Sequence, residues 1–194
     1  MLPQQSQPNN PSGSSKHTLI LTILGLVLTA IGLASLIELR PRPSVSSSSP
    51  VDSSNWLTSR FTATNDGYLQ LNDVHAICFL WKAQTNDGTT LYSNVIRTVA
   101  PENAILQPNQ GLTVPCSNRY IPLQGINGPY KSADLAIVVS YRPWPFTFIR
   151  QRKLFRFVAR PDDGNIVWDK QPPTVLEHDF NTLVNQNPNL SVFK

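Results

Sequence analysis

One stretch near the N-terminus is apolar and free of charge. Residues 18–37 contain no Asp, Glu, Lys or Arg, and Lys16 and Glu38 stand close to its two ends. A helix of about 20 residues is about 30 Å long, which matches the hydrocarbon core of a bilayer, and it satisfies its own backbone hydrogen bonds. A helix in a soluble domain would show a polar stripe at the helical period, and this run has none. The pattern predicts a transmembrane helix over residues 18–37.

We interpret this run as a retained anchor rather than a cleaved signal peptide. The apolar region of a signal peptide is about 7–15 residues long and is followed by small residues at the cleavage site. The run is longer than that, and the residues that end it, Ile37–Arg40, offer no such site. Basic residues near the two ends, Lys16 against Arg40 and Arg42, do not decide the orientation by themselves.

Composition divides the rest of the chain. Residues 1–17 are rich in Gln, Asn, Pro and Ser, which predicts a disordered tail. Residues 38–55 are rich in Ser and Pro, which predicts a flexible linker between the anchor and an exported domain. We expect that folded domain over residues 56–173. Residues 174–194 are rich in Asn and poor in apolar side chains, which predicts a C-terminal tail with at most a short helix near residues 175–184.

Within residues 56–173 the alternation of apolar and polar positions has the period of a β-strand. Turn sequences such as Asn65-Asp66-Gly67 and Asn86-Asp87-Gly88 separate the expected strands. The strand expected over residues 71–82 is apolar on both faces, which indicates a central strand. About seven short strands without a long helical period predict an all-β fold with two packed sheets.

Two segments resemble the strands of bacterial immunoglobulin-like extracytoplasmic domains. The first, residues 61–74, has a strand that ends in Asn, then a Gly, then a second strand that begins with a Leu-x-x-Val step. The second, residues 106–115, is similar to the Leu-x-Pro-Gly strand of such domains, with Asn109 where Gly is usual. The resemblance implies an immunoglobulin-like two-sheet sandwich preceded by one transmembrane α-helix. It also implies an accessory or adhesive module, a class without shared catalytic residues.

The two cysteines, Cys78 and Cys116, fall on the apolar faces of their expected strands. Two such cysteines in an exported domain favour a disulfide, which would stabilise the fold by about 3–4 kcal/mol in the chain-entropy model. Two buried free thiols are the alternative. A reactive thiol is disfavoured, because the neighbouring His75 faces the other side of the strand from Cys78.

Residues 142–160 are the most asymmetric segment of the chain. They hold six of the 16 basic residues and no Asp or Glu, and Trp and Phe are interleaved with the cations. Pro143 and Pro145 interrupt the strand pattern, so we expect residues 142–152 to project as a connection. The candidate interaction patch consists of Arg142, Trp144, Phe146, Phe148, Arg150, Arg152 and Lys153.

Three interpretations of this patch stay open at the level of the sequence. In the first, Phe155 and Phe157 are core residues of a strand whose Arg neighbours are solvated, and Trp144 caps the end of the sandwich. In the second, the segment contacts anionic lipid headgroups, where each cation near the surface contributes about 1 kcal/mol. In the third, Trp and Arg side chains anchor an acidic protein partner.

The sequence predicts no catalytic, cofactor or metal site. Asp73 and His75 share a face of a strand, but no nucleophile accompanies them. Asp162, Asp163 and Asn165 belong to a hairpin turn, without the Glu that closes a calcium loop. Two cysteines cannot supply four thiolate ligands to zinc, and a net charge of +4 is too small to indicate a nucleic-acid partner.

These observations predict a non-catalytic, single-pass protein of the bacterial inner membrane, with its sandwich domain on the extracytoplasmic side. The expected partners are the lipid bilayer, through residues 18–37, and a protein of the cell envelope. No nucleic acid and no small-molecule substrate is indicated. The alternative is a ligand-binding or enzymatic domain with its site at the ends of the sheets.

Overall fold

The structure is a computed structural model that describes residues 15–38, 40–48, 59–88, 90–96, 104–116, 130–162 and 165–194. The chain divides into two compact units, Met1–Leu39 and Arg40–Lys194. Most of the tail expected over residues 1–17 lies outside the described residues, and its last three residues are the start of a helix.

The first unit contains helix α1, Ser15–Glu38, with 24 residues. This helix includes the whole apolar run of residues 18–37. Its side chains are described over residues 19–32, and all of these are exposed. In the part of the chain that the structure describes, no helix meets both the length and the apolarity that a membrane crossing requires.

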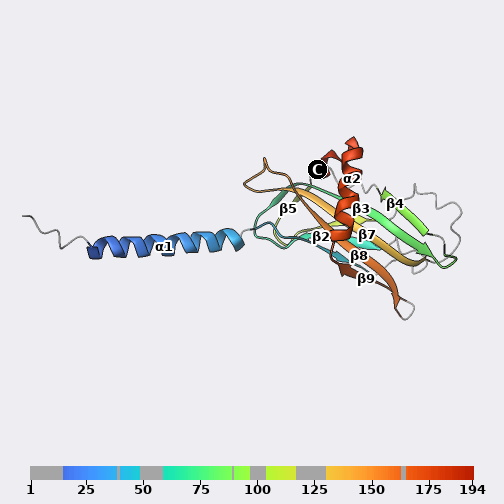
Figure 1. The fold of residues 1–194 in the computed structure, drawn as a ribbon, viewed down its shortest axis with the longest axis horizontal. Helices are drawn as coiled ribbons and strands as arrows, with labels where there is room; N and C mark the ends of the chain where they lie inside the picture. Colours follow the sequence, from blue (N-terminus) through green and yellow to red (C-terminus); the bar gives the residue numbers. More distant parts are fainter. Residues whose placement is uncertain are drawn as a thin grey trace, which may run out of the picture. The chain divides into compact units, whose positions relative to one another are not determined.

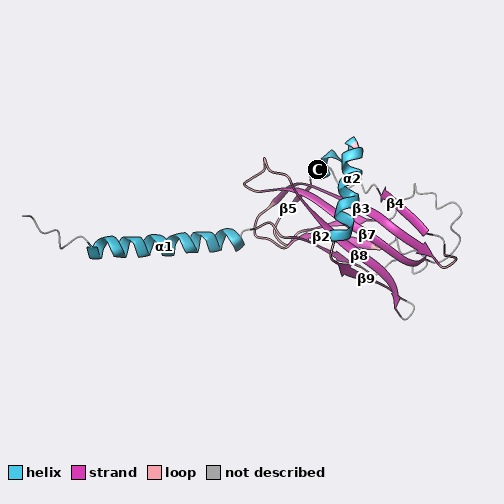
Figure 2. Ribbon diagram, in the orientation of Figure 1, coloured by secondary structure: helices cyan, strands magenta, loops and turns pink. Residues whose placement is uncertain are grey.

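The second unit is built on two antiparallel sheets (Figure 1 and Figure 2). In the described residues the smaller sheet has three strands in the order β1 (Pro43–Ser47), β2 (Arg60–Asn65) and β6 (Gly111–Pro115). The larger sheet has six strands: β4 (Thr90–Ile96), β3 (Leu71–Thr85), β7 (Tyr130–Pro143), β8 (Gln151–Asp162) and β9 (Asn165–Gln171) in this order, with β5 (Ala104–Leu106) also paired to β3. The predicted all-β, two-sheet arrangement is therefore confirmed, and β3 is central as expected.

The two sheets enclose the main hydrophobic core. Phe61 of β2, in the small sheet, is fully buried against the large sheet. Its ring centroid lies 5.1 Å from that of Phe157 on β8 and 5.4 Å from that of Trp168 on β9. The indole nitrogen Nε1 of Trp168 donates to Ser59 Oγ over 2.7 Å, so the polar end of this buried side chain is also satisfied.

A disulfide joins Cys78 and Cys116, whose Cα atoms are 5.5 Å apart. Cys78 lies on β3 of the large sheet, and Cys116 follows directly after β6 of the small sheet. The covalent link therefore ties the two sheets of the sandwich together.

The prediction of a flexible linker over residues 38–55 is wrong for the first half of that range. Residues Pro43–Ser47 form β1, which pairs antiparallel with β2. Val45 of this strand is buried in the main core, while Ser46 faces outward. A short edge strand gains its stability from backbone pairing and from its buried residues, here Pro43 and Val45, so serine at the other three positions does not prevent it. The folded domain thus begins near Arg40 and not at residue 56.

The prediction of a C-terminal tail over residues 174–194 is wrong, although the short helix that was possible near residues 175–184 is present. This segment forms helix α2, Thr174–Gln186, and a 3₁₀-helix η2, Pro188–Phe193. The apolar residues are few, but they fall four positions apart along α2 and so share one face: Leu176, Phe180 and Val184, all buried. Leu190 and Phe193 of η2 are buried with them.

This C-terminal segment covers the outer face of the large sheet and makes a third layer (Figure 2). The ring of Phe180 lies 5.6 Å from that of Phe79 on β3, in an edge-to-face arrangement. Trp81 of the same strand donates its Nε1 hydrogen to Asp179 Oδ2 over 2.9 Å. The second apolar face of β3 is thus buried by a segment that lies about 100 residues later in the sequence.

Candidate functional site

The candidate site begins at an irregular point of β3, around Asp73. The pairing of β3 with β7 shifts between Asn72 and His75, which indicates a β-bulge. Asp73 has φ of 49°, in the left-handed region that residues other than Gly and Asn rarely adopt. A bulge of this kind re-aims a side chain, and here the Asp73 carboxylate meets residues at both ends of the connection between β7 and β8.

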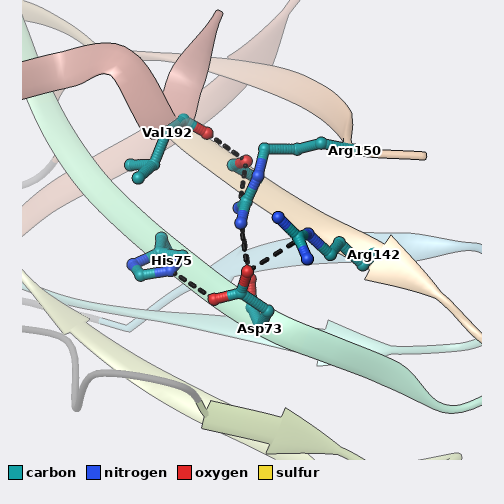
Figure 3. Close-up of polar contacts among 6 residues, drawn as sticks. Asp73, His75, Arg142, Arg150 and Val192 are labelled. Carbon is teal, nitrogen blue, oxygen red and sulfur yellow. Dashed lines mark hydrogen bonds and ion pairs between the residues drawn. The ribbon is translucent and has the colours of Figure 1, made fainter. Parts of the chain in front are cut away.

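Three side chains surround the carboxylate of Asp73 (Figure 3). His75 Nε2 lies 2.7 Å from Oδ1, Arg142 Nε lies 3.3 Å from Oδ2, and Arg150 Nη2 donates a short hydrogen bond to Oδ2. Burial alone would raise the pKa of Asp73. The hydrogen bond to His75 and the charges of Arg150, His75 and Arg142 outweigh this effect, so the pKa lies below its ordinary value of 3.8.

The same cluster holds the C-terminal segment on the sheet. Arg150 Nη1 donates to Ser140 Oγ over 3.1 Å, and this hydroxyl donates to the carbonyl of Val192 over 2.5 Å. Next to it, Arg152 Nη1 donates to the carbonyl of Phe193 over 2.5 Å. Two arginines of β8 and its preceding connection therefore bind, directly or through Ser140, the last residues of η2.

The Asp73–His75 pair is in contact, and the groups around it are bonded within the domain. Both carboxylate oxygens of Asp73 are bound within the domain. The hydroxyl of Ser140 is fully buried, and it bonds to Val192 and Arg150 rather than to His75. Among the described residues, no three His, Cys, Asp or Glu side chains are grouped in a way that would hold a metal ion.

The six cations of residues 142–160 all have partners inside the domain. These partners come from other segments of the domain, although Arg142, Lys153 and Arg160 are themselves exposed. The pairs are Arg142 and Arg150 with Asp73, Arg152 with Phe193, Lys153 with Pro43, Arg156 with Asp134, and Arg160 with Asp169. The hydrogen bond to Asp134 raises the pKa of Arg156, and the hydrogen bond to Asp169 raises the pKa of Arg160.

The aromatic residues of residues 142–160 divide into a buried group on β8 and an exposed group on the connection before it. Phe155 and Phe157, on β8, belong to the core, as the first interpretation of the segment expected. The residues of the connection between β7 and β8 face solvent: Trp144 is 54% exposed, Phe146 49% and Phe148 80%. The predicted patch is therefore divided. Its aromatic side chains are exposed, as are Arg142 and Lys153, while Arg150 and Arg152 are partly buried.

The connection itself is compact. The amide of Thr147 donates to the carbonyl of Pro145 and that of Ile149 to the carbonyl of Phe146, each over 3.0 Å. The rings of Phe146 and Phe148 pack edge to face, 6.2 Å apart. Exposed apolar side chains are thus held on a structured loop.

This connection lies at the end of the sandwich where the second unit begins. The amide of Trp144 donates to the carbonyl of Gln70, in the turn between β2 and β3 that carries the exposed Tyr68. In the same turn, a Cβ on Gly67 would lie 3.0 Å from the backbone nitrogen of Arg42 and 3.1 Å from the carbonyl oxygen of Arg40. We call the exposed residues of this region, Tyr68, Trp144, Phe146, Phe148 and Ile149, the aromatic end.

Several residues of this region escaped the sequence analysis. Ser140, Val192 and Phe193 were missed because the C-terminal segment was taken for a tail, although the unexplained outer apolar face of β3 was a signal that something covers it. Tyr68 and Ile149 lie in turns, where no strand periodicity indicates which side chains are exposed.

Comparison with protein-family models finds no match to this chain, and comparison with curated proteins finds none either. The resemblance to immunoglobulin-like extracytoplasmic domains therefore stays a prediction.

Proposed function

We propose that this chain is a membrane-anchored interaction module of the bacterial cell envelope and carries out no reaction of its own. The observation that carries the proposal is the division of residues 142–160. Their cations each have a bonding partner within the domain, although Arg142, Lys153 and Arg160 are also exposed, and the apolar side chains exposed between them are Trp144, Phe146, Phe148 and Ile149. Catalysis requires polar groups that are free to act on a substrate, whereas clustered exposed apolar side chains are typical of contact surfaces.

The anchor in this proposal is residues 18–37. The large apolar side chains from Leu19 to Ile31 on α1 have exposed fractions of 49–67%, which is costly in water and favourable in lipid. Thr29, a polar residue in this run, donates its hydroxyl hydrogen to the carbonyl of Gly25 over 2.7 Å. Its polar group is therefore satisfied within the helix, as a lipid environment requires.

The location in this proposal is the extracytoplasmic side of the inner membrane, with an immunoglobulin-like sandwich as the exported domain. The disulfide between Cys78 and Cys116 supports an oxidising compartment, because thiols of cytosolic proteins are kept reduced. The partner that we propose for the module is a second protein of the envelope.

Thiol labelling of the full chain in bacterial spheroplasts tests the location. Because Cys78 and Cys116 are bonded to each other, Lys194→Cys places a free thiol at the exposed C-terminus, and Ser6→Cys places one before the apolar run as the matched control. A membrane-impermeant maleimide is expected to label the first variant in intact spheroplasts and the second only after lysis. The reverse pattern would contradict the proposed location.

The anchor and the partner have separate tests. Leu24→Arg with Leu28→Arg is expected to move the chain out of the membrane fraction, because each Arg near the middle of a span costs about 2.5–3.5 kcal/mol. A chain that stays bound after this change would contradict the anchor. Crosslinking and mass spectrometry in native membranes should recover one recurrent protein neighbour if the chain is an interaction module.

A further inference from the structure

The aromatic end has the composition of a membrane interface. Residues 143–149 carry no charge, and they contain Trp144, Phe146, Phe148 and Ile149. Tyr68 joins them from the neighbouring turn and is 71% exposed. Trp and Tyr are enriched at the headgroup level of bilayers, because each has an apolar body and one polar group.

The charges close to the aromatic end are mostly positive. Arg40 and Arg42 are exposed, and their backbone lies against Gly67 in the turn that carries Tyr68. The exposed carboxylate of the same turn is that of Asp66. Arginines beside an apolar loop favour a surface that offers anionic headgroups above an apolar interior.

A single residue of the chain connects the anchor to the start of the second unit. Leu39 alone separates Glu38, the last residue of α1, from Arg40, the first residue of the second unit. Consecutive Cα atoms are about 3.8 Å apart, so the Cα atoms of Glu38 and Arg40 are at most about 8 Å apart. A bilayer that holds residues 18–37 therefore reaches its headgroups close to Arg40.

We infer that the aromatic end is a lipid-contacting surface, which inserts Trp144, Phe146 and Phe148 into the headgroup layer of the membrane that holds α1. The inference rests on the proposed anchor, and it assigns the bilayer as the binding partner of the aromatic end. A protein partner fits this surface less well. Protein hot spots combine aromatic residues with Arg at the centre of the contact, and Arg142 and Arg150 are bound to Asp73 instead.

The test uses the full chain in vesicles of phosphatidylcholine and phosphatidylglycerol. Thr147→Cys places a thiol for an environment-sensitive fluorophore at the tip of the connection and keeps every aromatic side chain. Asn86→Cys, at the exposed turn that follows β3, is the matched control. The native cysteines are bonded to each other and do not take the label. The measurements are flotation with the vesicles and quenching by lipids that carry a nitroxide on the acyl chain.

We expect the chain to float with the vesicles and the label at residue 147 to be quenched several-fold more strongly than the label at residue 86. A second variant, Trp144→Ser with Phe146→Ser and Phe148→Ser in the Thr147→Cys background, should lose this difference and keep flotation. These three side chains are exposed, so their removal leaves the core intact.

Each other outcome overturns the inference in a distinguishable way. A chain that floats without preferential quenching at residue 147 keeps the anchor and removes the lipid contact. Quenching that survives in the triple variant shows that proximity to the anchor, and not the aromatic side chains, brings the loop to lipid. A chain that does not float removes the anchor and the inference together. A photo-crosslinker at residue 147 that yields a discrete protein adduct in cells assigns the surface to a protein.

Discussion

Phe180→Ala tests whether the C-terminal segment is part of the fold. Phe180 is fully buried, packs edge to face on Phe79 with ring centroids 5.6 Å apart, and lies under the guanidinium of Arg152, 5.5 Å from its ring centroid. Truncation of a buried Phe to Ala costs about 3–5 kcal/mol, and the lost cation–π contact adds up to about 1 kcal/mol. We expect a loss of about 4 kcal/mol in the free energy of unfolding.

The matched control is Val175→Ala, on the same helix at a position that is 54% exposed. A surface change of this kind stays within about 0.5 kcal/mol. The assay is urea unfolding of the full chain in detergent, followed by tryptophan fluorescence. For a domain of this size, 4 kcal/mol corresponds to a fall in Tm of roughly 8–16 °C.

Equal stability of the two variants would refute the three-layer fold. Detachment of the segment without global unfolding is a separate event, because a terminal element can open locally. Limited proteolysis separates the two, since detachment exposes α2 and η2 to cleavage while the sandwich stays intact. If Phe180→Ala is neither destabilised nor cleaved faster within residues 174–194 than Val175→Ala, the reasoning fails.

Three further predictions concern covalent and charged contacts. Replacement of Cys78 and Cys116 by Ser is expected to cost about 4 kcal/mol in urea unfolding, and a loss below about 1 kcal/mol would argue against the cross-link. Arg156→Ala leaves a buried carboxylate unpaired and should cost about 3 kcal/mol, whereas Arg160→Ala, at an exposed pair, should leave the unfolding midpoint unchanged. Asp73 has a lowered pKa in the folded state, so its contribution is present above the unfolded pKa and is lost as pH falls through the folded pKa. Asp73→Asn should therefore lose less stability than wild type between about pH 5 and pH 3.

The strands were predictable where a residue's neighbours in sequence decide its environment. The apolar character of both faces of β3 indicated a central strand, and the sheet order confirms it. The Asn86-Asp87-Gly88 turn is a second example. Gly88 has φ of 87°, which favours Gly, and its amide donates to the carbonyl of Thr85 over 3.1 Å.

The elements that the sequence analysis missed depend on partners far away in the chain. Strand β1 has two buried residues, Pro43 and Val45, and it forms a strand because it pairs with β2. Helix α2 has three buried residues, too few to indicate a core helix without the apolar sheet face that they cover. In both cases the local pattern is weak, and tertiary contacts supply the stability.

The candidate site shows the same division. Asp73 and His75 are two positions apart, so the sequence already indicates that they are close, although the bulge at Asp73 interrupts the regular alternation of the strand. The contacts of Asp73 with Arg142 and Arg150 join residues about 70 positions apart, and they follow from the register of β3 with β7 and from the bulge. The register between β3 and β7 cannot be predicted from the charges along the sequence. The partners of the basic segment therefore stay open at the level of the sequence.

The two arginines that bind Asp73 lie at the two ends of the connection between β7 and β8. Arg142 precedes residues 143–149 and Arg150 follows them, and one carboxylate binds both. The Asp73 carboxylate therefore joins the two ends of the connection at its base, and we expect this to restrict the opening of the loop that carries the exposed aromatic side chains. Asp73→Asn removes the charge that holds both ends and should speed hydrogen exchange at the amides of Thr147 and Ile149.

The exchange experiment has a built-in comparison. Arg160→Ala breaks an exposed ion pair elsewhere on β8 and should leave the exchange of these two amides unchanged. The amides lie in turns closed by hydrogen bonds to the carbonyls of Pro145 and Phe146, so their exchange reports opening of the connection rather than global unfolding. If Asp73→Asn and Arg160→Ala exchange alike at both positions, the carboxylate does not clamp the loop, and the position of the aromatic end must come from its own turns alone.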